Sequence, residues 1–178
     1  MRHRAIPFLL ATFTMLAANS SILLAQPNFW EQTNGPSAGG ISSLVVDSSG
    51  DIFAASYLNP GVFRSTDDGD SWTQTTTGFM NSHVDVLAIN TKGHIFAGGY
   101  GDNHGSVFRS IDNGESWTQI DTTLPAQGIG AIAINESGDI FAIEGEGFYR
   151  STNNGDNWVQ ISGLAYPPRC LAISEVGS

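Results

Sequence analysis

The sequence predicts an all-β chain built from one four-stranded unit that recurs along its length. An eight-residue pattern, here called the box, occurs at Ser65–Trp72, Ser110–Trp117 and Ser151–Trp158. A fixed period near 40 residues marks one supersecondary unit that stacks on its own copies. No segment shows sustained helical periodicity, and glycine is frequent where turns are expected.

The repeat extends well beyond the box. An apolar-aromatic-Arg-Ser string ends at the first serine of each box, at Val62–Ser65, Val107–Ser110 and Phe148–Ser151. Further upstream, three ten-residue segments match one another: Val45–Ala54, Ala88–Ala97 and Ala133–Ala142. Each tryptophan of the chain, Trp30 included, is followed two residues later by glutamine. One structural unit therefore accounts for most of the chain.

Within a unit the elements follow in a fixed order. An apolar run such as Ser43–Val46 lacks clean alternation, which is typical of a strand covered on both faces. A tight turn leads to a second strand, Ile52–Ala55, and a loop of variable length to a third, Val62–Ser65. The box then turns the chain, and Trp72–Gln74 opens the fourth strand.

The box has a mechanical explanation. Asp67 can accept hydrogen bonds from backbone N–H groups two residues on, which closes an Asx-type turn. Gly69 can take a positive φ, and Trp72 can pack its ring under the turn. The third box has Asn153 in place of Asp, which favours a structural role over a metal site. The predicted structural residues are Ser65, Asp67, Gly69, Trp72, Ser110, Asp112, Gly114, Trp117, Ser151, Asn153, Gly155 and Trp158.

The N-terminus has the layout of a secretory signal peptide, residues 1–25. Arg2 and Arg4 precede an apolar stretch, and cleavage is expected after Leu23–Ala25, before Gln26. No cysteine stands at that site, so no lipid anchor is expected, and the protein is predicted to be exported to the periplasm, cell surface or medium. The repeats then occupy 26–178, with units at about 41–77, 84–122 and 129–163 and a partial unit at 169–178.

Charge and cysteine content narrow the function classes. The formal net charge of −10 becomes more negative once the signal is removed, which argues against nucleic acid and anionic membranes as partners. Cys170 is the single cysteine, so an internal disulfide is impossible. Its apolar neighbours predict a buried strand position for this thiol.

The box, Ser-x-Asp-x-Gly-x-x-Trp preceded by Phe-Arg, resembles the Asp-box, or bacterial neuraminidase repeat. It is similar to the version in sialidases, xyloglucanase-type glycoside hydrolases, sortilin-like receptors and photosystem II assembly-factor-like proteins. The resemblance implies a β-propeller of four-stranded antiparallel blades, with each box on the turn away from the substrate face. About 4–8 blades close such a ring.

Three full units and a partial fourth indicate an incomplete propeller, either the N-terminal part of a longer one or a truncated reading frame. Residues 28–33 match only a fourth strand, the kind that completes a last blade and closes a ring. Leu171 and Ile173 would lack a hairpin partner. Such open edges predict self-association.

Function is expected in the loops that differ between units. By strand direction, the loops between second and third strands and those between units emerge opposite the boxes, and loops on a rigid scaffold commonly carry binding sites. The candidate ligand-binding residues there are Tyr57, Tyr100, His104, Tyr166 and Arg169. Tyr57 and Tyr100 suit either a sugar-stacking platform or simple loop packing.

A catalytic site is harder to assemble from these residues. Glycosidases usually need two carboxylates, and Asp85, Asp102, Glu144 and Glu146 are available, although solvated loop acids look the same. The resemblance to sialidases implies a need for three arginines, yet Arg64, Arg109 and Arg150 are repeat-equivalent and only Arg169 is individual. The Phe/Tyr-Arg-Ile-Pro motif of sialidases is absent, so no catalytic residue is assigned.

Metal and cofactor sites are not expected. Asp67–Asp70 lacks the twelve-residue ligand pattern of a calcium loop. His83, His94 and His104 lack metal-ligand spacing. The sequence therefore predicts a secreted, non-catalytic module for binding or scaffolding, with a glycan or a protein as its partner. The alternative is an N-terminal fragment of a secreted glycoside hydrolase.

Overall fold

The structure is a computed structural model, and it describes residues 35–36, 40–79, 83–101, 104–120, 124, 128–162 and 170–173. The chain divides into two compact units, 1–31 and 32–178, and every described residue belongs to the second. The predicted signal peptide, the predicted closing strand at 28–33, Asp102, Tyr166 and Arg169 all lie outside the described residues.

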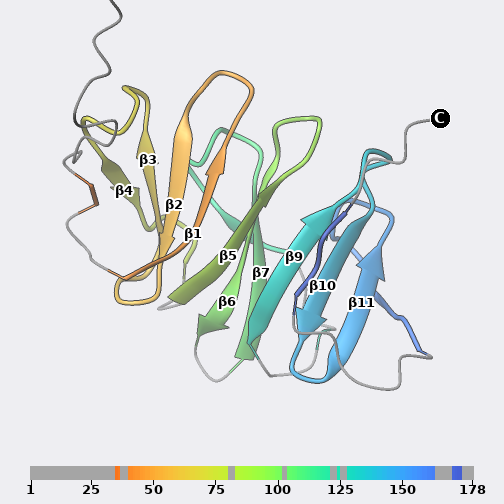
Figure 1. Ribbon diagram of the computed structural model, residues 1–178. Coiled ribbons are helices and arrows are strands. Elements are labelled where there is room, and N and C mark those ends of the chain that lie inside the picture. Colours follow the sequence, from red (N-terminus) through yellow and green to blue (C-terminus); the bar gives the residue numbers. More distant parts are fainter. Residues whose placement is uncertain are drawn as a thin grey trace, which may run out of the picture. The chain divides into compact units, whose positions relative to one another are not determined.

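The described part of the chain folds into three antiparallel sheets of four strands each, here called blades 1, 2 and 3 (Figure 1). Blade 1 holds β1 (Ile41–Val46), β2 (Ile52–Ser56), β3 (Val62–Ser65) and β4 (Thr73–Thr75); blade 2 holds β5 (His83–Ile89), β6 (Ile95–Gly101), β7 (His104–Ser110) and β8 (Thr118–Gln119); blade 3 holds β9 (Ile129–Ile134), β10 (Ile140–Glu144), β11 (Gly147–Ser151) and β12 (Val159–Gln160). In each sheet, strands adjacent in sequence are adjacent in space. The predicted all-β class and four-stranded unit are confirmed.

None of the described residues forms a helix of any length, and so none forms a helix that could cross a membrane. Strand content follows from composition, since the repeated segments alternate β-branched and aromatic residues with glycine-rich turns.

The turn between the first two strands is closed by one side chain. Asp47 Oδ1 accepts hydrogen bonds from the amides of Ser49, at 2.8 Å, and Asp51, at 2.9 Å. Asn90 makes the same two bonds in blade 2, to Lys92 and His94. An Asx-type bond to the amide two residues on therefore occurs in this turn.

The innermost strand of each blade carries one bulge near its start. The pairing register skips Ser42 in β1, Asp85 in β5 and Gly130 in β9. A bulge adds one residue to its strand and turns a side chain away from the regular pleat. Because the bulge recurs at equivalent positions in all three blades, it is part of the repeated unit.

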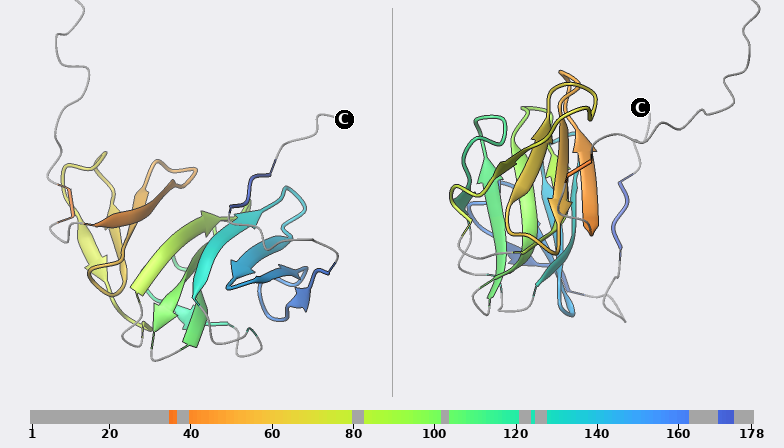
Figure 2. Two further views of the ribbon diagram at one scale, coloured as in Figure 1. Left: turned by 60° about the horizontal axis from the view of Figure 1, so that its bottom comes forward. Right: turned by 90° about the vertical axis from the view of Figure 1, so that its left-hand side faces the viewer.

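The hydrophobic core lies between neighbouring blades. One cluster joins blades 1 and 2 and includes Phe53, Ile95 and Phe108. A second joins blades 2 and 3 and includes Phe96 and Ile140. The inner strands β1, β5 and β9 lie side by side in that order (Figure 2). Neighbouring blades thus cover one another at two seams.

The prediction that Ser43–Val46 is covered on both faces is wrong, because Leu44 and Val46 are 56 % and 55 % exposed and no described blade packs on that face of β1.

The predicted buried strand position of Cys170 is wrong. The thiol is exposed, and residues 170–173 belong to no strand. The apolar neighbours of Cys170 resemble an inner strand, but in the described part of the chain no second strand pairs with them. Local pattern alone does not bury a segment without a partner.

Candidate functional site

The box is held by side-chain oxygens rather than by a sheet ladder. In the second box, Ser110 Oγ accepts from the amide of Gly114 at 2.8 Å and donates to Asp112 Oδ1 at 2.7 Å. Asp112 Oδ1 also accepts from the amide of Ser116, at 3.0 Å. That amide is four residues on, not two, so the predicted Asx-type geometry is wrong for the box.

These bonds change the acidity of the box carboxylate. Hydrogen bonds from the Ser116 hydroxyl and then the Ser116 amide lower the pKa of Asp112 to about 2. The Ser71 hydroxyl and amide lower the pKa of Asp67 in the same way. Both groups donate to the charged form and stabilise it. The carboxylates are therefore engaged by their own turns.

Each box contains two successive residues with positive φ. The glycines were expected to have this conformation, and Gly69, Gly114 and Gly155 do. The preceding residues Asp68, Asn113 and Asn154 have it too, with φ of 55°, 58° and 62°. This second left-handed residue was not predicted from the sequence. The available signal was residue type, since Asp and Asn tolerate the left-handed region better than other non-glycine residues.

Two of the three box tryptophans pack in the core that their blade shares with the preceding blade. Trp117 is buried in the core between blades 1 and 2, with its ring centroid 5.0 Å from that of Phe79. Trp158 packs against the core between blades 2 and 3. Trp72 is half-buried, and its Nε1 donates to the Gly69 carbonyl at 3.1 Å. The box thus contributes to the contact between blades.

The three repeat arginines are engaged near the box turns. Arg64 pairs with Asp51 at 2.7 Å, and Arg150 pairs with Asp139 at 2.5 Å. In blade 2 the equivalent acid is replaced by His94, and Arg109 instead reaches Asp156 of blade 3, at 2.9 Å, and the Asn154 carbonyl, at 2.7 Å. These guanidinium groups lie at the box end of the blades.

The candidate ligand-binding residues lie at the opposite end of the strands. Tyr57 and Tyr100 are exposed and follow or end the second strands of blades 1 and 2. Tyr57 donates its amide to the Gly40 carbonyl at 3.2 Å, and its ring lies against Gly40. His104 opens β7 opposite Gly101, which places it in the same hairpin as Tyr100. Tyr166 and Arg169 lie outside the described residues.

The four loop acids differ in their surroundings. Glu146 is exposed, as expected of a solvated loop acid, and Asp102 is outside the described residues. Asp85 is half-buried at its bulge, and burial raises its pKa. Glu144 is 2 % exposed, so its interpretation as a solvated acid is wrong. It ends β10 at the position of Ser56 and Gly99, which lies inside the blade.

The buried Glu144 affects a neighbouring phenol. Burial first, and the Glu144 charge second, raise the pKa of Tyr149. Glu144 was expected in the loop between the second and third strands, with Gly145 and Glu146, but it ends β10. The register of the repeat was the signal that could have located it, since the two equivalent residues are small.

Among the described residues, no three His, Cys, Asp or Glu side chains lie close enough together to hold a metal ion. The expectation that the chain has no metal or cofactor remains a prediction.

No protein-family model matches the chain, and no curated protein sequence matches it. Solved structures do match. Inactive H270A virginiamycin B lyase from Staphylococcus aureus, crystallised with quinupristin, aligns with a TM-score of 0.64 and 17 % identity, over 79 % of this chain and 48 % of that one. The GH74 xyloglucanase from Xanthomonas campestris aligns with a TM-score of 0.57 and 20 % identity, over 71 % and 22 %. These and other matching structures are β-propellers. This chain has an incomplete β-propeller fold.

A third match is the extracellular domain of the BT4673 two component system from B. thetaiotaomicron, with a TM-score of 0.57, 18 % identity and coverage of 70 % and 17 %. The chain spans less than half the length of each of these three structures. The likeness confirms the predicted propeller class. At these identities it shows the fold alone.

Proposed function

We propose that the chain is an exported β-propeller module that binds a ligand at its loop end without catalysing a reaction, and that a glycan is the ligand class to test first. The observation that carries the proposal is the placement of Tyr57 and Tyr100. They are exposed at equivalent positions of neighbouring blades, at the end of the strands opposite the boxes.

Tyrosine suits this role because its ring offers an apolar face for stacking and a hydroxyl for hydrogen bonding. The equivalent position of blade 3 is Gly145, so the aromatic pair is not a requirement of the repeat. By contrast, the box residues and the repeat arginines contact their own turns and the next blade. The rings of Tyr57 and Tyr100 are therefore open to a ligand, although the Tyr57 ring also lies against Gly40.

Binding can be tested on a glycan array with the full chain and with Tyr57→Ala and Tyr100→Ala. Each variant should lose binding by about tenfold or more, because each removes one stacking surface. Ile111→Ala is the control, since Ile111 is also an exposed, large apolar residue but lies on a box. A glycan site would be contradicted if all variants bound equally well or if the full chain bound no glycan. The ligand to test next would then be a protein.

A specific observation keeps an enzymatic alternative, part of a secreted glycoside hydrolase. Glu144 is a buried carboxyl at the loop end of β10, and burial is the kind of environment that adapts a carboxyl to general acid chemistry. One structural neighbour is a xyloglucanase. Hydrolysis of xyloglucan and of a fluorogenic sialoside by the full chain and by Glu144→Gln separates the two proposals. Turnover that Glu144→Gln abolishes would favour the enzyme.

Export is the remaining part of the proposal. It is supported by the signal-like residues 1–25 and by an extracellular domain among the structural neighbours. Expression of the full chain in a bacterium, followed by N-terminal sequencing of the protein outside the cytoplasm, tests it. The expected mature N-terminus is Gln26, and an uncleaved cytoplasmic chain would contradict export.

A further inference from the structure

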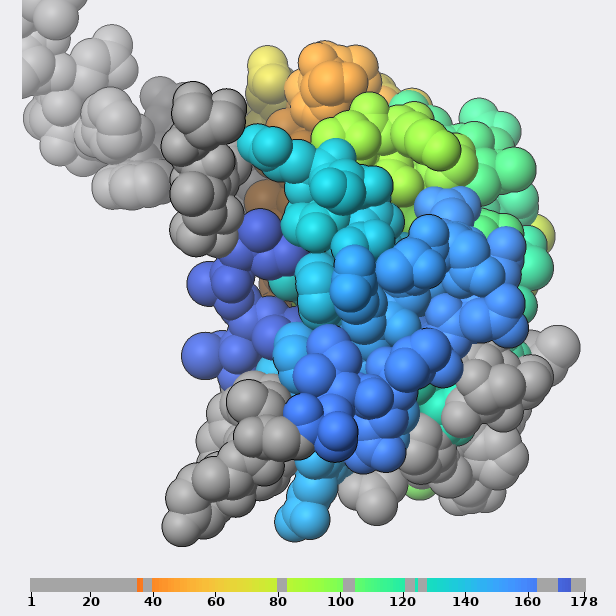
Figure 3. Space-filling view, turned by 90° about the vertical axis from the view of Figure 1, so that its right-hand side faces the viewer, coloured from red at the N-terminus to blue at the C-terminus, as the bar shows by residue number. Residues whose placement is uncertain are grey.

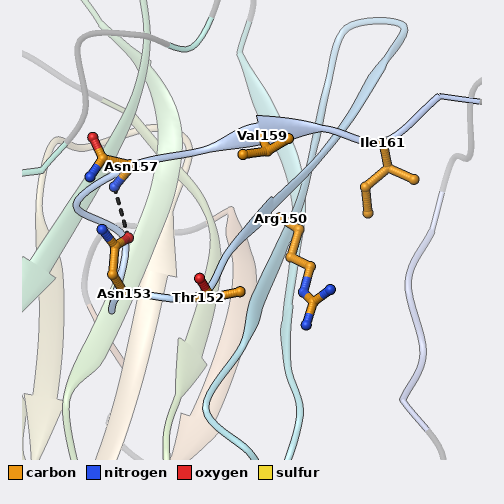
Figure 4. Close-up of a pocket in the computed structure, with 6 residues that line it drawn as sticks. All are labelled: Arg150, Thr152, Asn153, Asn157, Val159 and Ile161. Carbon is orange, nitrogen blue, oxygen red and sulfur yellow. Dashed lines mark hydrogen bonds between the residues drawn. The ribbon is translucent and has the colours of Figure 1, made fainter.

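The open side of blade 3 carries a groove lined by Arg150, Thr152, Asn153, Asn157, Val159 and Ile161 (Figure 4). Val159 and Ile161 lie on one side of it, and Arg150 projects from β11 on the other. The cavity volume is about 440 Å³. Figure 3 shows blade 3 from this side. The function proposed above makes no use of this groove.

Blade 1 has the same groove, and there it is occupied. Its lining includes Arg64, Thr66, Ser71, Thr73 and Thr75, which are the repeat equivalents of the blade 3 residues, together with Gly114 and Glu115 of blade 2. Its volume is about 250 Å³, smaller than in blade 3. The groove of a blade is thus the seat of the next blade's box.

Two contacts define this seat. Asn113 Nδ2 of the blade 2 box donates to Asp51 Oδ2 at 3.1 Å, and Gly114 lies against the Phe53 ring. In the next seam Gly155 lies against Phe96. Phe53 and Phe96 are fully buried, whereas the equivalent Phe141 of blade 3 is only half-buried.

The arginine beside the seat shows the same difference. The Arg64 side chain, next to the occupied seat of blade 1, is 25 % exposed. The equivalent Arg150 side chain is 47 % exposed. Both arginines lie over the phenylalanine of their own blade, 5.9 Å from the ring centroid. The seat of blade 3 therefore has the same arginine over the same phenylalanine as the occupied seat, and among the described residues no box lies in it.

Blade 1 presents the opposite half of the same contact. Leu44 of β1 is 56 % exposed, whereas the equivalent Leu87 of β5, which packs on blade 1, is 4 % exposed. Ile41 is likewise exposed where its equivalents Val84 and Ile129 are buried. The face with which blades 2 and 3 cover their predecessors is therefore open on blade 1.

We propose that blade 1 of a second copy of this chain docks on blade 3, head to tail, with its box at Asp67–Asp70 in the Arg150 groove. The two open faces are the two halves of an interface that the chain already forms twice within itself, which is why a second copy fits. A contact between different faces continues from copy to copy until a ring closes.

The charge of the box residue Asp68 should weaken this contact, and its effect on association can be measured. At the second non-glycine position of the turn, the boxes that dock within the chain have Asn113 and Asn154, whereas the box of blade 1 has Asp68. In the proposed contact Asp68 meets Asp139, the equivalent of Asp51. Two carboxylates at hydrogen-bond distance repel, and the Asp139 partner Arg150 offsets only one of them. Asp68→Asn should therefore strengthen association by about tenfold or more.

Sedimentation equilibrium of the full chain over a concentration series tests the proposal. The wild type should reach a mass of at least two chains. Leu44→Glu removes one face and Val159→Glu the other, and both residues are exposed, so the variants should fold. Each alone should be monomeric, and Ile111→Glu, an exposed residue of blade 2, should behave as the wild type.

Mixing gives the decisive result. Leu44→Glu retains an intact blade 3 and Val159→Glu an intact blade 1, so an equimolar mixture should form a one-to-one dimer. A monomeric wild type, variants that associate like the wild type, or a mixture that stays monomeric would each overturn the proposal. Unchanged association of Asp68→Asn would overturn the placement of the box in the groove.

Discussion

At the scale of the residue, each box is stabilised by a few oxygens that accept several bonds. Asp112 and its neighbours Ser110 and Ser116 form one such group. The third box does the same with an amide, since Asn153 Oδ1 accepts from the Asn157 amide at 2.9 Å. The oxygen is therefore the required group, and the negative charge is not.

The oxygen can be separated from the charge by two substitutions. Asp112→Ala removes the acceptor for the Ser116 amide and should lower the free energy of unfolding by about 1 kcal/mol, a modest loss because water reaches the site. Asp112→Asn keeps an acceptor oxygen, as Asn153 does, and should cost clearly less. Urea denaturation of both variants checks this. An equal loss for the two would mean that the charge holds the turn.

Acid should remove the contribution of the charge. Because the folded pKa of Asp112 is lowered to about 2 from 3.8, its ionisation stabilises the fold above the unfolded pKa. This part is lost as the pH falls from about 4 toward 2. The difference in unfolding free energy between wild type and Asp112→Asn should therefore change across that window and be constant above it. A constant difference at all pH values would show that the carboxyl has an ordinary pKa in the fold.

Residue type and sequence position predict the exposure of some candidate site residues but not the burial of Glu144. Tyr57 stands just before the turn residues Asn59–Gly61, and Tyr100 stands just before Gly101, and their exposure at the loop end agrees with that. Glu144 also precedes a glycine, yet it is buried, because β10 extends to include it and the register places it inside the blade. Whether a residue at a strand end is buried depends on how the strands pair, and residue type alone does not predict that pairing.

At the scale of the element, the seam between blades depends on a close approach of backbone to ring. A Cβ built on Gly114 would lie 2.9 Å from Phe53 Cε1. Phe53 belongs to β2 and Gly114 to the box after β7, so the box of one blade fits the second strand of the blade before it. The repeated Ile-Phe-Ala strand and the repeated box are thus two parts of one contact.

Gly114→Ala tests this close contact between the box and the Phe53 ring. The substitution places a methyl group against the ring and a side chain at φ +82°, and the combined loss should be about 2–4 kcal/mol. Gly138→Ala is the control, because Gly138 has a φ of +84° with no atom within 4 Å of its Cβ. It should lose only about 1 kcal/mol, from the backbone term. Similar denaturation midpoints for the two variants would show that the methyl group meets no resistance.

Comparison of the internal repeats predicts the positions of most strands, because strand and turn formation depends on residues that are close together in the sequence. The third strand at Val62–Ser65 has the predicted bounds, and the second, expected at Ile52–Ala55, ends one residue later. The fourth begins at Thr73 rather than Trp72, because the tryptophan leaves the strand to pack near the turn. The contacts between blades, such as Arg109 with Asp156, join residues of different repeats and leave no mark in a single repeat.

At the scale of the whole molecule, the described blades are coupled in series. One hydrophobic cluster joins blades 1 and 2, another joins blades 2 and 3, and β5 and β9 lie beside their predecessors. In repeat architectures of this kind, stability is approximately a sum of unit terms and nearest-neighbour terms. Loss of one seam should therefore loosen the blades unequally.

Hydrogen exchange of Ile129→Ala tests this coupling. Ile129 is fully buried in the seam between blades 2 and 3, and its truncation should cost about 2–5 kcal/mol. Amides of β9–β12 should exchange faster, with a smaller change in β1–β4. Val84→Ala removes the equivalent side chain from the other seam and should show the reverse pattern, with β1–β4 exchanging faster. If either variant accelerated exchange equally in blades 1 and 3, the three blades would unfold as one cooperative unit and the serial description would be wrong.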